Sequence, residues 1–120
     1  GSVVCISSIA GIEITDAPIP YSIAKSALNA YIKNNVKPFA KLGIRINGVA
    51  PGNILFKGSI WERKILKNKK RVYDMIASKV AMNRFGIPIE IANAVVFLSS
   101  SVSSFTTGNI LVIDGGQVKS

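Results

Sequence analysis

The sequence contains no histidine, a single cysteine and no apolar run long enough to cross a membrane. Without histidine, a Ser-His-Asp triad is excluded and a zinc site loses its commonest nitrogen ligand. Cys5 lies alone in an apolar run, which predicts a buried thiol in a reducing compartment rather than a disulfide framework. The longest apolar run, residues 91–98, is interrupted by Asn93 and is too short for a bilayer. We therefore expect a cytoplasmic protein whose chemistry uses other side chains.

The length and composition predict one small globular domain. The chain has 120 residues, of which 48% are apolar, so a packed core is expected and disorder is not. It has no initiator methionine and no signal peptide, and Gly1-Ser2 leads directly into an apolar stretch. We interpret this start as that of a fragment of a longer protein, with Gly1-Ser2 as an alternative cloning remnant.

The positive charge is concentrated in one segment. The net charge is +9, and residues 57–71 carry only one aromatic side chain, Trp61. We interpret this basic segment first as a solvated helical face and second as a rim that attracts anions to a binding site. A nucleic-acid-binding module ranks last, because the segment contains no recognisable nucleic-acid-binding motif. The basic residues of this segment are Lys57, Arg63, Lys64, Lys67, Lys69, Lys70 and Arg71.

Three segments have the pattern of strands in a parallel sheet. Residues 2–7 are rich in β-branched residues with a continuous apolar centre, which predicts a strand buried on both faces. Residues 44–50 and 109–113 predict the second and third strands. Between the first two strands, apolar residues recur at helical spacing over residues 21–42, and Pro38 should kink or shorten the end of that helix.

The second half of the chain is mainly helical in pattern. Residues 59–80 predict basic, loosely patterned helix, as two short pieces, and Pro88 begins a further helix that extends to about residue 100. The resulting order, β-α-β-α-α-β, implies right-handed crossovers and a parallel sheet covered by helices on both faces. The stripe expected to be buried on the last helix is Ile91, Ala92, Val95, Val96 and Leu98.

Polar residues at the strand ends predict the site. Ligands of open parallel sheets bind beyond the carboxyl ends of the strands. Ser8 follows the first strand, the Pro51-Gly52 turn follows the second, and the stretch "YSIAK" begins the first helix. Tyr21 and Lys25 are four residues apart, so they share one helix face. We expect all of these residues to gather in one site.

This set of side chains suits proton transfer to oxygen. An ordinary phenol is a poor acid–base group at neutral pH. The ammonium of Lys25, one turn along, can stabilise the phenolate of Tyr21 and so ease proton transfer. The Ser8 hydroxyl can hydrogen-bond the same substrate oxygen. Side chains cannot supply the hydride that carbonyl reduction needs, so this chemistry implies a nicotinamide cofactor.

Five sequence blocks resemble the carboxyl-terminal half of a short-chain dehydrogenase/reductase. In order they are "GSVVCISSIAG", "YSIAK" beginning thirteen residues after Ser8, "GIRINGVAPG", "RFGIPIEIANAVVFLSS" and "TTGNILVIDGG". The resemblance covers essentially the whole chain, and it implies a Rossmann-like, doubly wound parallel sheet of which residues 1–120 form the carboxyl-terminal portion.

The resemblance also implies residue roles. In the family pattern the lysine holds the nicotinamide ribose, the Pro-Gly turn packs against the nicotinamide, and a backbone position two residues later meets the carboxamide. The implied catalytic residues are Ser8, Tyr21 and Lys25. The implied cofactor-binding residues, for NAD or NADP, are Tyr21, Lys25, Pro51, Gly52 and Ile54.

Some residues depart from the family pattern or stay open between two interpretations. Phe56 stands where the family usually has a cofactor-contacting threonine, which puts that contact in doubt. The sequence has no Gly-rich pyrophosphate turn, and the family's catalytic asparagine, from an earlier helix, is also missing. Ser7 is interpreted as a structural partner of the strand end, and Asn53 as either a loop residue or a substrate contact.

Three functions compete at this point. The first is an NAD(P)-dependent carbonyl reductase or alcohol dehydrogenase, seen as its catalytic half and inactive alone. The second is a truncated, non-catalytic remnant of such an enzyme, and the third is the basic nucleic-acid-binding module. For the enzyme we expect a small carbonyl or alcohol substrate, with an acyl thioester on a carrier protein (a 3-oxoacyl-carrier-protein-reductase-like activity) and a sugar acid as anionic candidates. The family resemblance further implies a homo-oligomer.

Overall fold

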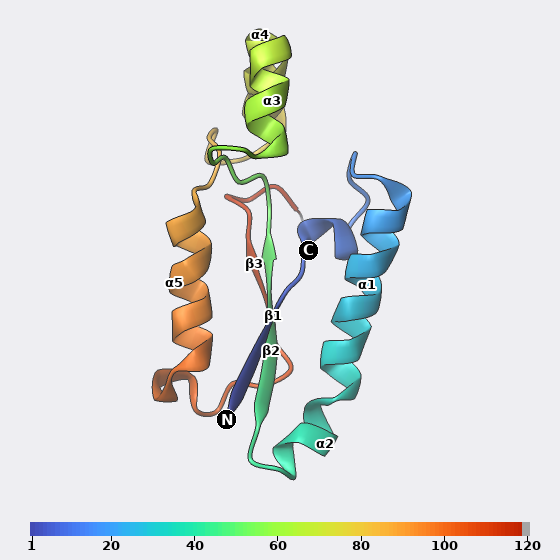
Figure 1. Cartoon of the computed structure of the whole chain (residues 1–120), viewed down its shortest axis with the longest axis vertical. Coiled ribbons are helices and arrows are strands. Elements are labelled where there is room, and N and C mark those ends of the chain that lie inside the picture. Colours follow the sequence, from blue (N-terminus) through green and yellow to red (C-terminus); the bar gives the residue numbers. More distant parts are fainter. Residues whose placement is uncertain (119–120) are drawn as a thin grey trace.

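The computed structural model describes residues 1–118, which form a three-stranded sheet between helices (Figure 1). The whole is elongated, with extents of 51 × 28 × 26 Å. The elements in chain order are strand β1 (Ser2–Ile6), the 3-10 helix η1 (Ile9–Gly11), helices α1 (Ile19–Asn34) and α2 (Val36–Ala40), strand β2 (Arg45–Pro51), helices α3 (Ile60–Lys67), α4 (Lys69–Lys79) and α5 (Pro88–Ser99), the 3-10 helix η2 (Ser101–Ser103) and strand β3 (Ile110–Ile113).

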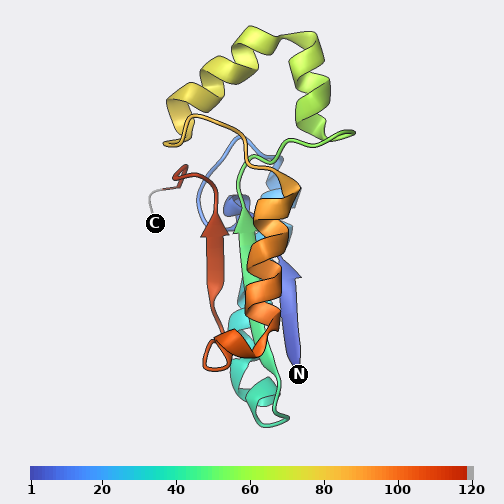
Figure 2. The ribbon, with the colours of Figure 1, turned by 90° about the vertical axis from the view of Figure 1, so that its left-hand side faces the viewer.

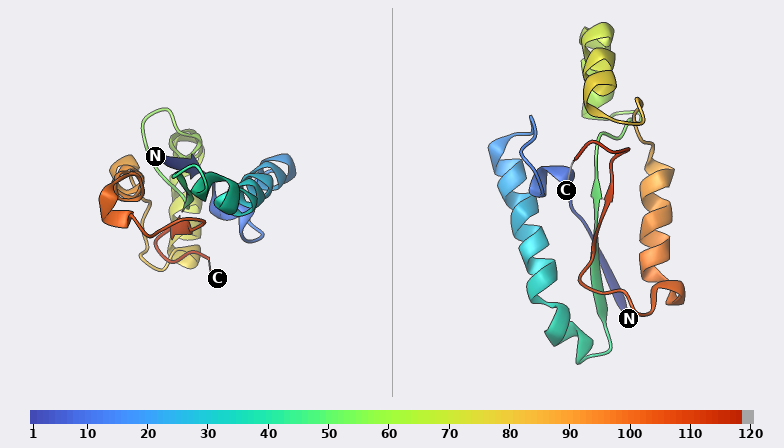
Figure 3. Two further views of the ribbon diagram at one scale, coloured as in Figure 1. Left: turned by 90° about the horizontal axis from the view of Figure 1, so that it is seen from below. Right: turned by 180° about the vertical axis from the view of Figure 1, so that it is seen from behind.

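The sheet has the predicted parallel topology. The strand order is β1-β2-β3, and both pairs are parallel, with Val3 opposite Ile46 and Val49 opposite Leu111. Helix α5 lies on one face and α1 on the other, as the view from below shows (Figure 3). All three strands therefore present their carboxyl ends to the same edge of the sheet, which is the upper edge in Figure 2.

The first long helix is divided where Pro38 acts on it. The sequence predicts one helix over residues 21–42, but α1 ends at Asn34 and α2 resumes at Val36. Proline has no N–H to bond the carbonyl four residues earlier, here that of Asn34, and its ring clashes with that group. The predicted kink is therefore confirmed, and it lies one turn before the proline.

Helices α3 and α4 form an arm beyond the carboxyl edge of the sheet (Figure 2). The predicted pair of short helices is confirmed there. The arm has its own small core of Val72, Ile76, Val80 and Phe85, and partly buried apolar side chains such as Trp61 pack against it. The basic residues of residues 57–71 are all exposed, as expected of a solvated helical face.

Two expectations about burial are wrong. The strand predicted to be buried on both faces is β1, but Val3 is 37% and Ile6 47% exposed. The reason is that β1 is an edge strand of the described sheet, with β2 as its only neighbour there. In the stripe predicted for α5, Leu98 is buried but Val96 is 67% exposed, because three strands are too narrow to cover the whole stripe.

Two smaller points concern the absences noted in the sequence. Cys5 is only half-buried rather than fully buried, and this burial raises the pKa of its thiol. Within residues 1–118, no helix is both long and apolar enough to span a bilayer.

Candidate active site

A cavity of about 810 Å³ lies at the carboxyl edge of the sheet, between the turn after β1, the start of α1 and the arm. Its size falls within the range usual for small-molecule and cofactor pockets. Ser8, Tyr21 and Gly52 all line it, so the structure brings together three of the residues predicted from strand ends. Lys25, Pro51 and Ile54 are not among the described residues of the lining.

Ser8 is held in place by the turn that follows it. It is the N-cap of η1, and its Oγ accepts a hydrogen bond of 3.1 Å from the amide of Ala10. The side chain is nearly buried, with 8% exposed. A hydroxyl group offers one proton and two lone pairs, and the cap needs only a lone pair. The Ser8 proton is therefore not needed for the cap and can be donated to a ligand in the cavity.

Tyr21 and Lys25 lie in the first two turns of α1. Pro20 occupies the first turn of this helix, where its missing N–H costs nothing, and this fixes where the helix begins. Tyr21 remains 45% exposed at the cavity. The Nζ of Lys25 lies 5.6 Å from the centre of the Tyr21 ring and donates a 2.9 Å hydrogen bond to the carbonyl of Ile6. The ammonium is thus fixed between the end of β1 and the phenol.

The turn after β2 approaches the end of β3 closely. A Cβ on Gly52 would lie 2.7 Å from Cβ and 2.9 Å from Cα of Asp114, so only glycine fits there without a shift. Asn53 lines the cavity and donates a 2.8 Å hydrogen bond from Nδ2 to Oε1 of Gln117. Ile54 pairs with Gly86 in a parallel bridge, which ties the turn to the segment before α5.

Phe56, which stands at the usual threonine position of the family pattern, is 51% exposed. It is not among the described residues that line the cavity. Ser7, interpreted from sequence as structural, is buried and donates its hydroxyl to Oδ1 of Asn29 at 2.5 Å.

Charged side chains at the cavity come from distant parts of the chain. Asp16, before α1, pairs with Lys79, at the end of α4, with 2.5 Å between Oδ2 and Nζ. The hydrogen bond from Lys79 lowers the pKa of Asp16, and the charges of Lys79 and Lys64 lower it further. Glu13, Asp16, Lys64 and Lys79 are the charged residues of the described lining, so the two signs balance.

Several lining residues were missed by the sequence reasoning. Gln117 follows the end of β3, so the rule that points to carboxyl strand ends could have found it. Met75 reaches the cavity from the arm, and Asp16 meets Lys79 across 63 residues of sequence. No local pattern marks these three side chains, because their position depends on how the arm folds back over the sheet.

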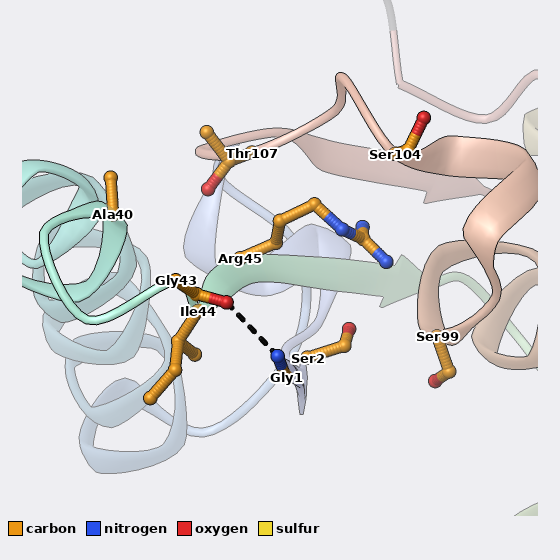
Figure 4. Close-up of a pocket in the computed structure, with 9 residues that line it drawn as sticks. All are labelled: Gly1, Ser2, Ala40, Gly43, Ile44, Arg45, Ser99, Ser104 and Thr107. Carbon is orange, nitrogen blue, oxygen red and sulfur yellow. Dashed lines mark hydrogen bonds between the residues drawn. The ribbon is translucent and has the colours of Figure 1, made fainter.

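A second hollow, of about 480 Å³, lies at the opposite, amino edge of the sheet (Figure 4). Gly1 and Arg45 line it, and the Gly1 amino group donates a 2.9 Å hydrogen bond to the carbonyl of Gly43. The Arg45 guanidinium is held by backbone carbonyls and by Ser103. This hollow lies at the wrong end of the strands for a ligand site of a parallel sheet.

Comparison with known proteins gives the family. A family model described as enoyl-(acyl carrier protein) reductase matches residues 1–117. The chain belongs to the short-chain dehydrogenase/reductase family. The resemblance first seen in the five sequence blocks is thereby confirmed.

Two curated relatives illustrate this membership. A tropinone reductase homolog of Arabidopsis thaliana is 37% identical over 117 residues, which are 97% of this chain and 43% of the relative. A 3-oxoacyl-[acyl-carrier-protein] reductase of Thermotoga maritima is 36% identical over 118 residues, or 98% of this chain and 46% of the relative. The chain thus spans about half the length of the curated relatives it matches.

Solved structures agree with the fold. An NADPH-bound short-chain oxidoreductase from Pseudomonas aeruginosa, described as having an atypical catalytic center, matches all of this chain and 47% of its own, with a TM-score of 0.88 and 25% identity. A 4-hydroxyisoleucine dehydrogenase complexed with NADH matches 98% of this chain and 46% of its own, with a TM-score of 0.84 and 29% identity. The predicted Rossmann-like fold class is confirmed.

Proposed function

We propose that residues 1–120 are the carboxyl-terminal, catalytic portion of a single Rossmann-like domain. The whole protein would then be an NAD(P)-dependent oxidoreductase that interconverts a carbonyl and a secondary alcohol. The observation that carries this proposal is the shared cavity of Ser8 and Tyr21, with the Lys25 ammonium fixed beside the Tyr21 ring. Relatives named as oxidoreductases and reductases support it.

The residues at the cavity fit the nicotinamide end of such a cofactor. When bound, the cofactor supplies the hydride that no side chain can supply. Lys25 has three N–H donors and uses one of them on the carbonyl of Ile6, so two are left for ribose hydroxyls. Gly52 presents bare backbone at the cavity. The residues assigned to the cofactor are those of the sequence analysis: Tyr21, Lys25, Pro51, Gly52 and Ile54.

The pyrophosphate end has no counterpart in this sequence. Dinucleotide phosphates usually rest on a Gly-rich turn at a helix N-terminus, and no such motif occurs in residues 1–120. This chain alone should therefore be inactive and should not bind the cofactor measurably. The remaining half of the domain would have to provide that turn.

Three side chains of this chain would carry the proton chemistry. The Ser8 hydroxyl would donate a hydrogen bond to the substrate oxygen and hold it beside Tyr21. The Tyr21 hydroxyl would give its proton to that oxygen in reduction and take it back in oxidation. The Lys25 ammonium would stabilise the negative charge on the phenolate that forms.

The charged side chains that line the cavity do not favour a substrate of either charge. Of the seven basic residues in residues 57–71, only Lys64 is in the described lining. Glu13 and Asp16 balance Lys64 and Lys79 there. We therefore propose a small carbonyl or alcohol substrate, for which a 3-oxoacyl thioester is one candidate because of the Thermotoga maritima relative.

The full-length protein is proposed to form a homo-oligomer. Helix α1 leaves apolar side chains exposed on its outer face, and Ile23 is 64% exposed. A contiguous exposed apolar patch often marks an interface. Sedimentation of the full-length protein should show a species larger than the monomer, and a monomer at micromolar concentration would contradict this proposal.

The test of function is Tyr21→Phe in the full-length protein. We expect turnover of carbonyl substrates with NADH or NADPH to fall by at least about 1000-fold, while cofactor binding stays within about twofold, because only the proton donor is lost. Tyr31→Phe is the matched control, since Tyr31 lies on the same helix, is exposed and is outside the described cavity lining. Retained turnover in Tyr21→Phe would contradict the proposed mechanism.

A further inference from the structure

Asn29 lies on the same face of α1 as the proposed catalytic pair. Tyr21, Lys25 and Asn29 are spaced by four residues, about one helical turn each. Asn29 is partly buried, and its amide faces the segment that carries Ser8. Nothing in the proton chemistry described above uses this side chain.

The Asn29 amide binds the chain on both sides of Ser8. Its Oδ1 accepts the Ser7 hydroxyl at 2.5 Å, and its Nδ2 donates to the carbonyl of Gly11 at 3.2 Å. The two contacts use opposite ends of the amide, so they also fix its orientation. A side chain with only an acceptor or only an apolar end cannot make both.

The segment between these contacts rests directly on α1. A Cβ on Gly11 would lie 2.8 Å from the carbonyl carbon of Lys25 and 3.0 Å from Nδ2 of Asn29. The backbone of Gly11 therefore packs directly against α1, with no room for a side chain. Ser26 also donates to the Gly11 carbonyl at 3.2 Å. Ser8 therefore lies in a loop whose two ends are fastened to the helix that carries Tyr21.

We propose that Asn29 is a positioning residue, whose amide sets the distance between the Ser8 hydroxyl and Tyr21. This inference rests on the proposed function, in which both hydroxyls must meet one substrate oxygen. A displacement of about 1 Å at such a contact can lower the rate by about 100-fold. Asn29 is outside the described lining of the cavity, so it would act through Ser7 and Gly11 rather than by contact with a ligand.

The first test is Asn29→Leu in the full-length protein, which keeps the approximate volume and removes both hydrogen bonds. We expect kcat to fall by about 10- to 100-fold while the KM for the cofactor changes by less than about twofold. Asn34→Leu is the matched control on the same helix, because the Asn34 amide donates to the carbonyl of Ala30 one turn earlier and lies on the exposed side. An unchanged kcat in Asn29→Leu overturns the proposal.

A double-mutant cycle separates positioning from general destabilisation. Ser7→Ala removes the partner of Oδ1, so Ser7→Ala combined with Asn29→Leu should lower kcat little more than Asn29→Leu alone. A purely structural loss would instead act through the folded fraction, and urea denaturation of each variant measures that fraction. Effects on kcat that multiply in full would contradict action through Ser7.

Amide hydrogen exchange gives a readout that does not depend on turnover. In Asn29→Leu the amides of residues 8–12 should exchange about tenfold or more faster, while those of β2 keep the rates of the parent protein. If the parent protein shows no carbonyl reduction, the proposed function fails. Hydrogen exchange then still tests whether Asn29 holds the segment of residues 7–11 against α1. Faster exchange over residues 8–12 then supports it, and unchanged exchange overturns it.

Discussion

The two ends of the same parallel sheet use their polar groups differently. At the amino edge, the Arg45 guanidinium has four acceptors within 2.9 to 3.2 Å, and its Nη1 shares two hydrogens among three of them. The acceptors are the carbonyls of Leu98, Ser100 and Thr106 and the Ser103 hydroxyl. At the carboxyl edge, Ser8 and Tyr21 line a cavity. The hydrogen bonds of Arg45 at the amino edge therefore hold the fold together, whereas Ser8 and Tyr21 at the carboxyl edge are placed where a ligand could bind.

The difference follows from strand direction. The loops that enter the strands at the amino edge are held by the side chain of the first residue of β2, which makes that edge a structural joint. The loops that leave the strands at the carboxyl edge carry Ser8, Gly52 and Gln117, and the arm covers them from above. Substitutions at the two edges should accordingly separate loss of stability from loss of activity.

The largest effect on stability is expected for Arg45→Leu. Hydrogen bonds from a charged donor contribute about 1.5 to 3 kcal/mol, and the partly buried carbonyls left behind would lose their partner. We expect the free energy of unfolding to fall by about 3 kcal/mol, measured by urea denaturation.

Two controls define that result. Arg63→Leu, on the exposed surface of α3, should change the free energy of unfolding by no more than about 0.5 kcal/mol. Arg45→Lys keeps the positive charge but loses the planar guanidinium with its several donors. Its free energy of unfolding should therefore lie between those of Arg45→Leu and Arg63→Leu. If Arg45→Leu is as stable as Arg63→Leu, the amino edge is not the structural joint described here.

A smaller effect is expected at Asn53 and Gln117, and it decides between the two interpretations of Asn53. Their side-chain hydrogen bond of 2.8 Å favours the interpretation of Asn53 as a loop residue. Asn53→Ala and Gln117→Ala should each lower the free energy of unfolding by about 1 kcal/mol, and the double variant by little more. An increase of KM for the carbonyl substrate in Asn53→Ala that Gln117→Ala does not share would make Asn53 a substrate contact instead.

Local sequence patterns predicted much of this arrangement. Periodicity gave the strands and helices, and Pro38 explained a break in the first long helix, although not its position at Asn35. The rule that ligands bind beyond the carboxyl ends of parallel strands predicted that Ser8, Tyr21 and Gly52 lie together, and all three line one cavity. These features depend on neighbouring residues or on strand direction alone, which a single sequence shows.

Long-range packing accounts for what the patterns did not predict. The pairing of Asp16 with Lys79 requires the arm to fold back over the turn before α1. The exposure of Val96 depends on how many strands lie beneath α5. The roles of Arg45 and Asn29 depend on carbonyls from other segments, because a backbone acceptor leaves no mark in the sequence.

The smallest effect is a pH dependence at the start of α5, next to the carboxyl edge. Arg84 donates to both carboxylate oxygens of Glu90, at 2.7 and 3.1 Å, and the amide of Ile87 donates to Oε2 at 2.9 Å. The hydrogen bonds from Arg84, and then that from Ile87, lower the pKa of Glu90 from 4.5 to about 2. A carboxylate with a lowered pKa stabilises the fold above its unfolded pKa, and this contribution is lost as pH falls.

Glu90→Gln should therefore lower Tm near pH 7, and the gap from the parent protein should close as pH falls from about 4.5 to 2. The measurement is thermal unfolding by circular dichroism at a series of pH values, and the gap should be small because the pair is exposed to solvent. Glu62→Gln, in the first turn of α3, is the matched control, since Glu62 accepts from the Gly58 amide at 3.2 Å rather than from a guanidinium. A gap for Glu90→Gln that stays constant from pH 7 to pH 2 would show that the charge of Glu90 does not stabilise this edge.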